Sequence, residues 1–210
     1  MATIQQDFTL DGVSISLSAK AENRAALRRL VCKLGVPTDR DVFALDESFA
    51  VKVSDLLEWC QKNGRPMKPF FMRRDVWQQA KFWRQSRPIE EIQKAADKLH
   101  REGAPFLAAA LIDVGPQNGR WATNALPGQS WHQWGLAVDC FAVGDNGKAI
   151  WRASFDSYEF YANRAKAIGL TPGYFWRRRD AVHVQAQSDG VRQVYTWPEI
   201  DREMKKRYNK

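Results

Sequence analysis

Histidine is the residue type that points most directly to chemistry, because the chain of 210 residues contains only three. His132 lies in the segment SWHQWGLAVD and His183 in the segment DAVH, so each stands near an aspartate. The third, His100, comes at the end of a predicted helix beside Arg101, where it is expected to favour the helix C-terminus or to face water. Chemistry is therefore expected at His132 and His183.

Two aspartates complete a pattern that is typical of a catalytic zinc site. Asp139 shares a strand face with Ala137, and a carboxylate in an apolar strand is costly unless it is paired or bound to a cation. A catalytic zinc ion commonly takes three protein ligands and keeps one position for water, and His132, Asp139 and His183 meet that count. Asp180, three residues before His183, is expected to take a proton from the attacking water and pass it to the leaving amine. We therefore predict one Zn²⁺ and a hydrolytic reaction.

The order SxHxxGxAxD, followed later by DxxH, resembles the signature of the zinc D,D-peptidase and L-alanyl-D-glutamate endopeptidase family, whose fold is shared with bacteriophage cell-wall lysins. The sequence around these motifs also resembles the family, including the segments TNA at 123–125 and PG at 127–128. Trp176, four residues before Asp180, matches a recurrent tryptophan of the family and is a candidate to support the metal ligands or to line the substrate groove. The resemblance covers roughly residues 51–185 and implies a zinc peptidase of the bacterial cell wall.

An arginine is also implied by this resemblance. Arg74, followed by QA at 79–80, FW at 82–83 and Arg87, is similar to the arginine-containing strand-to-helix segment of the family. The resemblance implies that Arg74 helps to bind and polarise the substrate near the scissile bond. The preceding position is usually aromatic but here is Arg73, which therefore remains a rival. The run Arg177–Arg179 is unusual for the family and is a candidate to alter substrate preference.

Three residues beside His132 have candidate supporting roles. Ser130 is expected to shape the loop that delivers His132 and to support that histidine by a hydrogen bond. Trp131 and Trp134 either line the substrate groove or pack in the core.

The implied substrate is the peptidoglycan stem peptide, cut by an L-alanyl-D-glutamate endopeptidase acting as a phage-type endolysin. A D-Ala-D-Ala carboxypeptidase or dipeptidase of the same fold is the alternative. The N-terminus shows no signal peptide, so we expect synthesis in the cytoplasm and release to the wall by a separate protein. The net charge of +8 suits an anionic wall.

Other classes of protein explain less of the pattern. A basic nucleic-acid-binding protein would account for the net charge and the nine tryptophans, but it would not explain the two motifs in which histidine and aspartate occur together. A non-catalytic wall-binding protein would not need Asp180. A serine hydrolase lacks its GxSxG motif, and strand alternation turns Cys140 away from Asp139. We expect no nucleic-acid partner, no membrane insertion and a monomer.

The elements that must position these residues mix helices with short strands without a regular βαβ alternation, which predicts an α+β fold with a small antiparallel sheet around the zinc. A hairpin with a turn at Asp11-Gly12 and a helix through Leu27 and Leu34 form an N-terminal extension, residues 1–40, and the catalytic domain is expected over residues 41–210. Within it, helices are predicted near residues 56–64, 75–85, 89–103, 157–168 and 197–207, and strands at 67–72, 135–143, 149–151 and 181–185.

Overall fold

The computed structural model describes residues 3–10, 13–20 and 41–209. The chain divides into two compact units, each made of two segments of the sequence. The first comprises Met1–Arg73 and Trp134–Ser188, and the second comprises Arg74–Gln133 and Asp189–Lys210. The predicted Asp11-Gly12 turn, the predicted helix through Leu27 and Leu34, and Cys32 lie outside the described residues.

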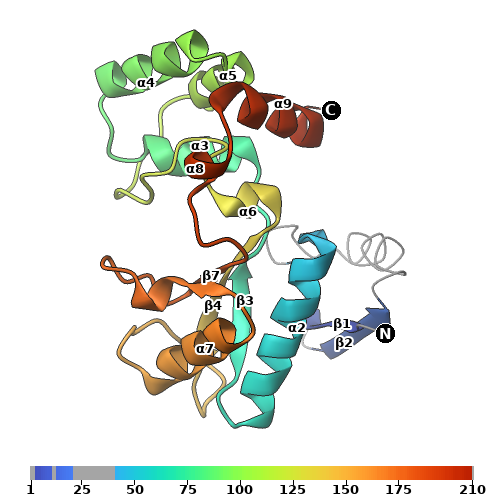
Figure 1. Ribbon diagram of the computed structural model, residues 1–210. Coiled ribbons are helices and arrows are strands. Elements are labelled where there is room, and N and C mark those ends of the chain that lie inside the picture. The colour runs from blue at the N-terminus through green and yellow to red at the C-terminus, as the bar shows by residue number, and fades with distance from the viewer. Residues whose placement is uncertain (1–2, 11–12, 21–40, 210) are drawn as a thin grey trace. The chain divides into compact units, whose positions relative to one another are not determined.

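The first unit is built on a five-stranded antiparallel sheet. Its strand order is β3-β4-β7-β6, with β5 added beside β4 (Figure 1). The strands are β3 (Met67–Phe71), β4 (Ala137–Val143), β5 (Ala149–Ile150), β6 (Thr171–Pro172) and β7 (His183–Gln185). Together with helices in both units, this sheet confirms the predicted α+β class.

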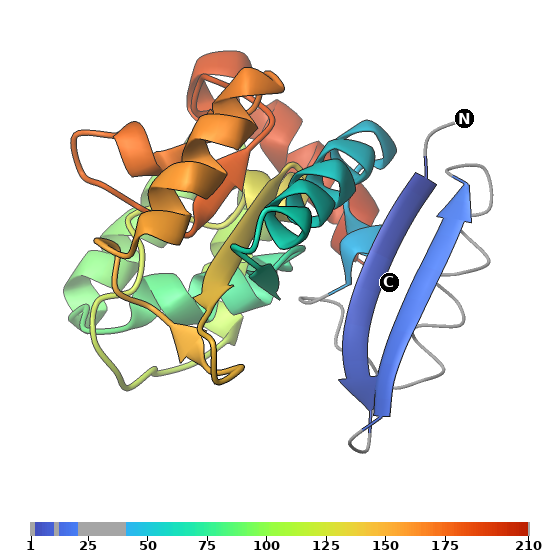
Figure 2. The same ribbon diagram turned by 90° about the horizontal axis from the view of Figure 1, so that it is seen from below.

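Two helices cover one face of this sheet, and the candidate metal ligands of β4 and β7 project from the other face. The helices α2 (Glu47–Lys62) and α7 (Asp156–Ala167) lie side by side (Figure 2) and share a hydrophobic core with Val138, Cys140 and Ala142 of β4. Because side chains alternate along a strand, Asp139 and Phe141 project from the opposite face. The predicted inward direction of Cys140 is confirmed.

The helix α2 has clear sequence signals at both ends. The Asp46 side chain accepts a hydrogen bond from the backbone N of Ser48, which caps the first turn. Buried residues recur at Phe49, Val53, Leu56 and Cys60, which is the spacing of one helical face. Asn63 caps the C-terminus and Gly64 follows at a φ of 69°, as the sequence predicted for the end of this helix. The helix begins at Glu47, well before the predicted range 56–64.

The N-terminal hairpin belongs to the first unit. Its strands β1 (Thr3–Leu10) and β2 (Val13–Lys20) pair antiparallel, which confirms the predicted hairpin. The backbone N of Gln5 donates to Ser54 Oγ at 2.6 Å, and that hydroxyl donates to the Gln5 carbonyl at 2.8 Å, so β1 is attached to α2. An extension ending at residue 40 stays a prediction.

The second unit consists of helices and the loop that precedes α6. Its longer helices were predicted except for one, α5, whose apolar sequence PFLAAALID shows little helical periodicity because neighbouring positions are apolar as well. The helices are α3 (Val76–Arg84), α4 (Ile89–Arg101), α5 (Pro105–Asp113), α8 (Val191–Val194) and α9 (Trp197–Tyr208), and α6 (Trp131–Trp134) continues into the first unit. None of the helices in the described residues combines the length and the apolar character that crossing a membrane requires.

Candidate metal centre and active site

Asp139 and His183 are brought together by strand pairing. They occupy directly opposite positions of β4 and β7, so their side chains project from the same face of the sheet. His183 Nδ1 lies 2.9 Å from Asp139 Oδ1. The two residues are 44 positions apart in the sequence, and the register of these two strands alone makes them neighbours.

The His183 ring is buried and polar groups surround it. Burial by itself lowers the pKa of this histidine, but the hydrogen bond to Asp139 and the charges of Asp139 and Asp180 outweigh it, so the pKa is raised above its ordinary value. The second ring nitrogen, Nε2, lies 3.0 Å from Gln185 Oε1. The sequence analysis did not single out Gln185, although its position two residues after His183 in a strand places it on the same face.

His132 lies in the one-turn helix α6 rather than in the loop that the sequence predicted. Gln133 explains the difference, because its backbone N donates to the Ser130 carbonyl and its Oε1 accepts from the backbone N of Gly128 at 2.9 Å and of Ser130 at 3.2 Å. Four residues are too few to show helical periodicity in a sequence. Gly135, at a φ of 73°, then turns the chain into β4 as predicted.

Ligand atoms of three residues converge within the described part of the chain. One nitrogen each from His132 and His183 and one carboxylate oxygen from Asp139 all lie within 4.8 Å of one another. Two imidazoles and a carboxylate are ligands that zinc prefers, and three protein ligands leave one coordination position for water or substrate. The donor set therefore fits a catalytic zinc ion.

Asp180 and Trp176 lie on a loop that is closed just before β7. The backbone N of Asp180 donates to the Gly173 carbonyl at 2.9 Å, and the Trp176 N donates to the same oxygen at 3.1 Å. A side chain at Gly173 would come within 2.7 Å of the Asp180 carbonyl, so only glycine fits at this closure. Asp180 is exposed, and the Trp176 ring lies 5.2 Å from the ring of His183.

Arg74 is buried, and its guanidinium group is oriented by a glutamine. Arg74 Nη1 donates to Gln79 Oε1 at 3.0 Å, and the Gln79 amide donates to the Ala125 carbonyl at 2.8 Å. The backbone N of Arg74 also donates to the carbonyl of His132 at 3.3 Å. Arg74 is therefore attached to the segment that carries a candidate metal ligand, whereas Arg73 is the last residue of the first unit.

The structure places the two candidate tryptophans beside His132 in buried positions. Trp131 is buried, and its Nε1 donates to the Asp189 carbonyl at 2.8 Å. Trp134 is buried as well. It stays a prediction that the Ser130 hydroxyl supports His132 by a hydrogen bond. It also stays a prediction that Trp131 lines the substrate groove.

The two described cysteines are unsuited to nucleophilic catalysis. Cys60 and Cys140 are both buried in the hydrophobic core and form no disulfide. Burial raises the pKa of Cys60 to about 12 and that of Cys140 further, so neither forms a thiolate near neutral pH.

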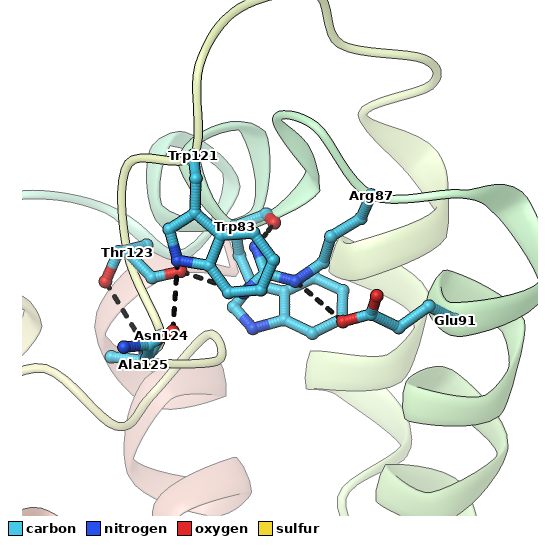
Figure 3. Close-up of polar contacts among 7 residues, drawn as sticks. All are labelled: Trp83, Arg87, Glu91, Trp121, Thr123, Asn124 and Ala125. Carbon is cyan, nitrogen blue, oxygen red and sulfur yellow. Dashed lines mark hydrogen bonds and ion pairs between the residues drawn. The ribbon is translucent and has the colours of Figure 1, made fainter.

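Arg87 contacts the segment 121–125, which lies in the loop before α6. Figure 3 shows its guanidinium group between the indoles of Trp83 and Trp121, with ring-centroid distances of 3.9 and 3.6 Å. Arg87 also donates to the carbonyls of Trp83 and Thr123, the latter at 3.0 Å, and pairs with Glu91 at 2.9 Å. Arg87 therefore connects α3 and α4 with the segment 121–125, and burial lowers the pKa of its guanidinium.

Comparison with known proteins identifies the family. The VanY family, described as D-alanyl-D-alanine carboxypeptidase, matches residues 43–186. A solved structure of a glutamate-to-alanine mutant of the vancomycin resistance D,D-pentapeptidase VanY, from a VanB-type resistance cassette and in complex with Zn(II), is similar at 17% identity over 79% of each chain, with a TM-score of 0.41. No curated protein matches the chain. Because the family match extends over more than half of the sequence, the chain belongs to the VanY D-alanyl-D-alanine carboxypeptidase family and is a peptidase.

Proposed function

We propose that this chain hydrolyses the stem peptide of peptidoglycan, with zinc held by His132, Asp139 and His183. The observation that carries the proposal is the convergence of these three side chains within 4.8 Å, beside a loop that holds Asp180 three residues before His183. When bound, the metal polarises the scissile carbonyl and lowers the pKa of a coordinated water. The donor chemistry and the family match both support this assignment.

Asp180 is proposed as the proton carrier of the reaction. The water oxygen adds to the carbonyl carbon, the C–N bond breaks, and the leaving amine needs a proton. An exposed carboxylate that takes the proton from the water and gives it to the amine meets both needs with one group. The closure of its loop on the Gly173 carbonyl supports this role, because it restricts the backbone of Asp180.

Arg74 is proposed to hold the substrate. Gln79 Oε1 orients its guanidinium group at 3.0 Å, and a planar guanidinium suits a carbonyl or a carboxylate oxygen of a peptide. The alternative, Arg73, has no such role in this proposal, because the backbone bond from Arg74 N to the His132 carbonyl favours Arg74.

Two peptide bonds of the stem peptide are candidates for the bond that this chain cuts. The family match favours the terminal D-Ala-D-Ala bond, as in a carboxypeptidase. The motif SxHxxGxAxD followed by DxxH favours the L-Ala-D-Glu bond, as in a phage-type endolysin. Both substrates are parts of the same stem peptide, so the choice does not alter the roles of the residues.

Digestion of purified peptidoglycan, followed by mass analysis of the released fragments, tests the proposal. We expect cleavage that stops on chelation and returns with added zinc. New N-termini at D-Glu would identify an endopeptidase, and release of D-Ala alone would identify a carboxypeptidase. No cleavage by the zinc-loaded protein would refute the proposed substrate.

A further inference from the structure

The Gln185 side chain contacts the second nitrogen of the His183 ring, and hydrogen bonding determines the orientation of its amide group. The residue is buried in β7, between Ala137 of β4 and Thr171 of β6. Its Oε1 lies 3.0 Å from His183 Nε2. On the other side, its amide nitrogen donates to the Gln187 carbonyl at 2.6 Å.

These two contacts determine which atom of Gln185 faces the histidine. A backbone carbonyl can only accept, so the amide NH₂ must face Gln187 and the amide oxygen must face His183. Because the amide oxygen also only accepts, His183 Nε2 must carry a hydrogen. Nδ1 faces the Asp139 carboxylate at 2.9 Å, which also only accepts, so without a metal this nitrogen carries a hydrogen as well. A zinc ion that binds between the two residues would replace the hydrogen on Nδ1, and the hydrogen on Nε2 would stay on the Gln185 side.

We infer that Gln185 is a positioning residue that holds His183 in the Nε2–H tautomer and thereby makes Nδ1 the zinc-binding atom. The inference rests on the proposed function, because it assumes that His183 is a zinc ligand. A ligating histidine commonly donates its other ring N–H to an acceptor that fixes the tautomer and the ring, and loss of such an acceptor costs about 10- to 100-fold in metal affinity.

A purely packing role for Gln185 makes a different prediction. Packing depends on the volume of the side chain, whereas tautomer control depends on an acceptor atom at the position of Oε1. Gln185→Met keeps a similar volume and removes the acceptor. Gln61→Met is the matched control, because Gln61 is exposed on α2, far in sequence from the site.

The experiment measures zinc affinity by competition with a chromophoric chelator, with the fold of each variant checked by circular dichroism. We expect Gln185→Met to bind zinc about 10- to 100-fold more weakly than the wild type. Gln61→Met is expected to bind zinc as the wild type does. Unchanged affinity in a folded Gln185→Met variant would overturn the inference.

A second measurement does not depend on any variant. Long-range ¹H–¹⁵N spectra of the zinc-loaded wild type should show a protonated Nε2 and a metal-bound Nδ1 at His183. The reverse assignment would overturn the inference even if Gln185→Met failed to fold. A wild-type protein that binds no zinc at all would instead contradict the proposed function, so the two failures are distinguishable.

Discussion

Asp139 and His183 face each other directly across β4 and β7, with Oδ1 and Nδ1 2.9 Å apart. A carboxylate and an imidazole so placed on one sheet face can share a cation, and His132 supplies a third donor. Strand register therefore determines this part of the proposed metal centre, and each ligand can be tested separately.

Replacing Asp139 by Asn should remove zinc while preserving the fold. The amide has nearly the shape of the carboxylate but no negative charge, and zinc sites use carboxylate oxygens. Metal analysis after dialysis should find one zinc per chain in the wild type and much less in Asp139→Asn. Asp145→Asn, in an exposed turn, is the matched control and should retain the metal. Full zinc content in Asp139→Asn would remove Asp139 from the ligand set.

Replacing Asp180 by Ala should separate metal binding from turnover. Zinc should stay bound, because Asp180 lies outside the proposed ligand set. The turnover number kcat should fall by about 10²- to 10⁴-fold, the usual contribution of a positioned acid or base. Steady-state kinetics on a stem peptide, compared with Asp113→Ala at the exposed end of α5, measures this. A zinc-loaded Asp180→Ala variant with wild-type kcat would mean that another group carries the proton.

Replacing Arg74 by Lys tests whether the guanidinium group, rather than its charge, is needed. Lys keeps the positive charge but cannot reproduce the planar donor arrangement that Gln79 orients. We expect kcat/KM to fall by about 10- to 100-fold, the equivalent of one charge-assisted hydrogen bond. Arg73→Lys serves as the control and should change kcat/KM little. If the two variants exchanged these effects, Arg73 would be the functional arginine.

Replacing Arg87 by Met should destabilise the protein. The variant loses two hydrogen bonds to carbonyls and the contacts of the guanidinium group with two indoles, and it leaves two partly buried acceptors without this donor (Figure 3). We expect the free energy of unfolding to decrease by about 2–4 kcal/mol. The ion pair with Glu91 is lost as well, and it is only partly screened by solvent, because the Arg87 side chain is 2% exposed and the Glu91 side chain 45%. Urea unfolding measures the change, with the exposed Arg101→Met as control, and an unchanged midpoint for Arg87→Met would contradict the stabilising role.

Asp201 gives a prediction about pH. Its Oδ1 accepts the backbone N–H of Leu107 at 2.9 Å, but burial outweighs this bond and raises the pKa of the carboxyl above 3.8. A raised pKa means that the folded state binds the proton more tightly than the unfolded state. The contribution of Asp201 to stability is therefore largest below pH 3.8 and is lost as the pH rises through the raised value.

Asp201→Asn should remove the loss of stability that the wild type shows as the pH rises. The amide oxygen still accepts the backbone N–H of Leu107, and the amide carries no charge. The variant should be at least as stable as the wild type at neutral pH, whereas Asp201→Ala should lose about 1–3 kcal/mol by leaving the N–H unsatisfied. The difference in unfolding free energy between the wild type and Asp201→Asn, measured from pH 4 to 7, should grow with pH. A difference that shrinks would show that the sign of the pKa shift is wrong.

The sequence by itself determined the features that depend on local order. Strand alternation separates Asp139 from Cys140, the spacing of apolar residues places the C-terminal part of α2, and a glycine allows the turn into β4. Each of these is a property of neighbouring residues, which a sequence displays directly. The family resemblance likewise rested on two short motifs, and the family match confirms it.

Only the tertiary structure decided which residues support the candidate site. Gln79 acts through Ala125, which is distant in sequence, and Gln133 acts through a turn without periodicity, so no sequence pattern marks these two residues. Gln185 lies two residues after His183 in the same strand, and only the structure shows that its side chain contacts the histidine ring. The one-turn helix α6 and the apolar helix α5 were missed for the same physical reason, since neither has a measurable helical period. Pairing of β4 with β7 depends on long-range contacts, and that pairing places His183 opposite Asp139.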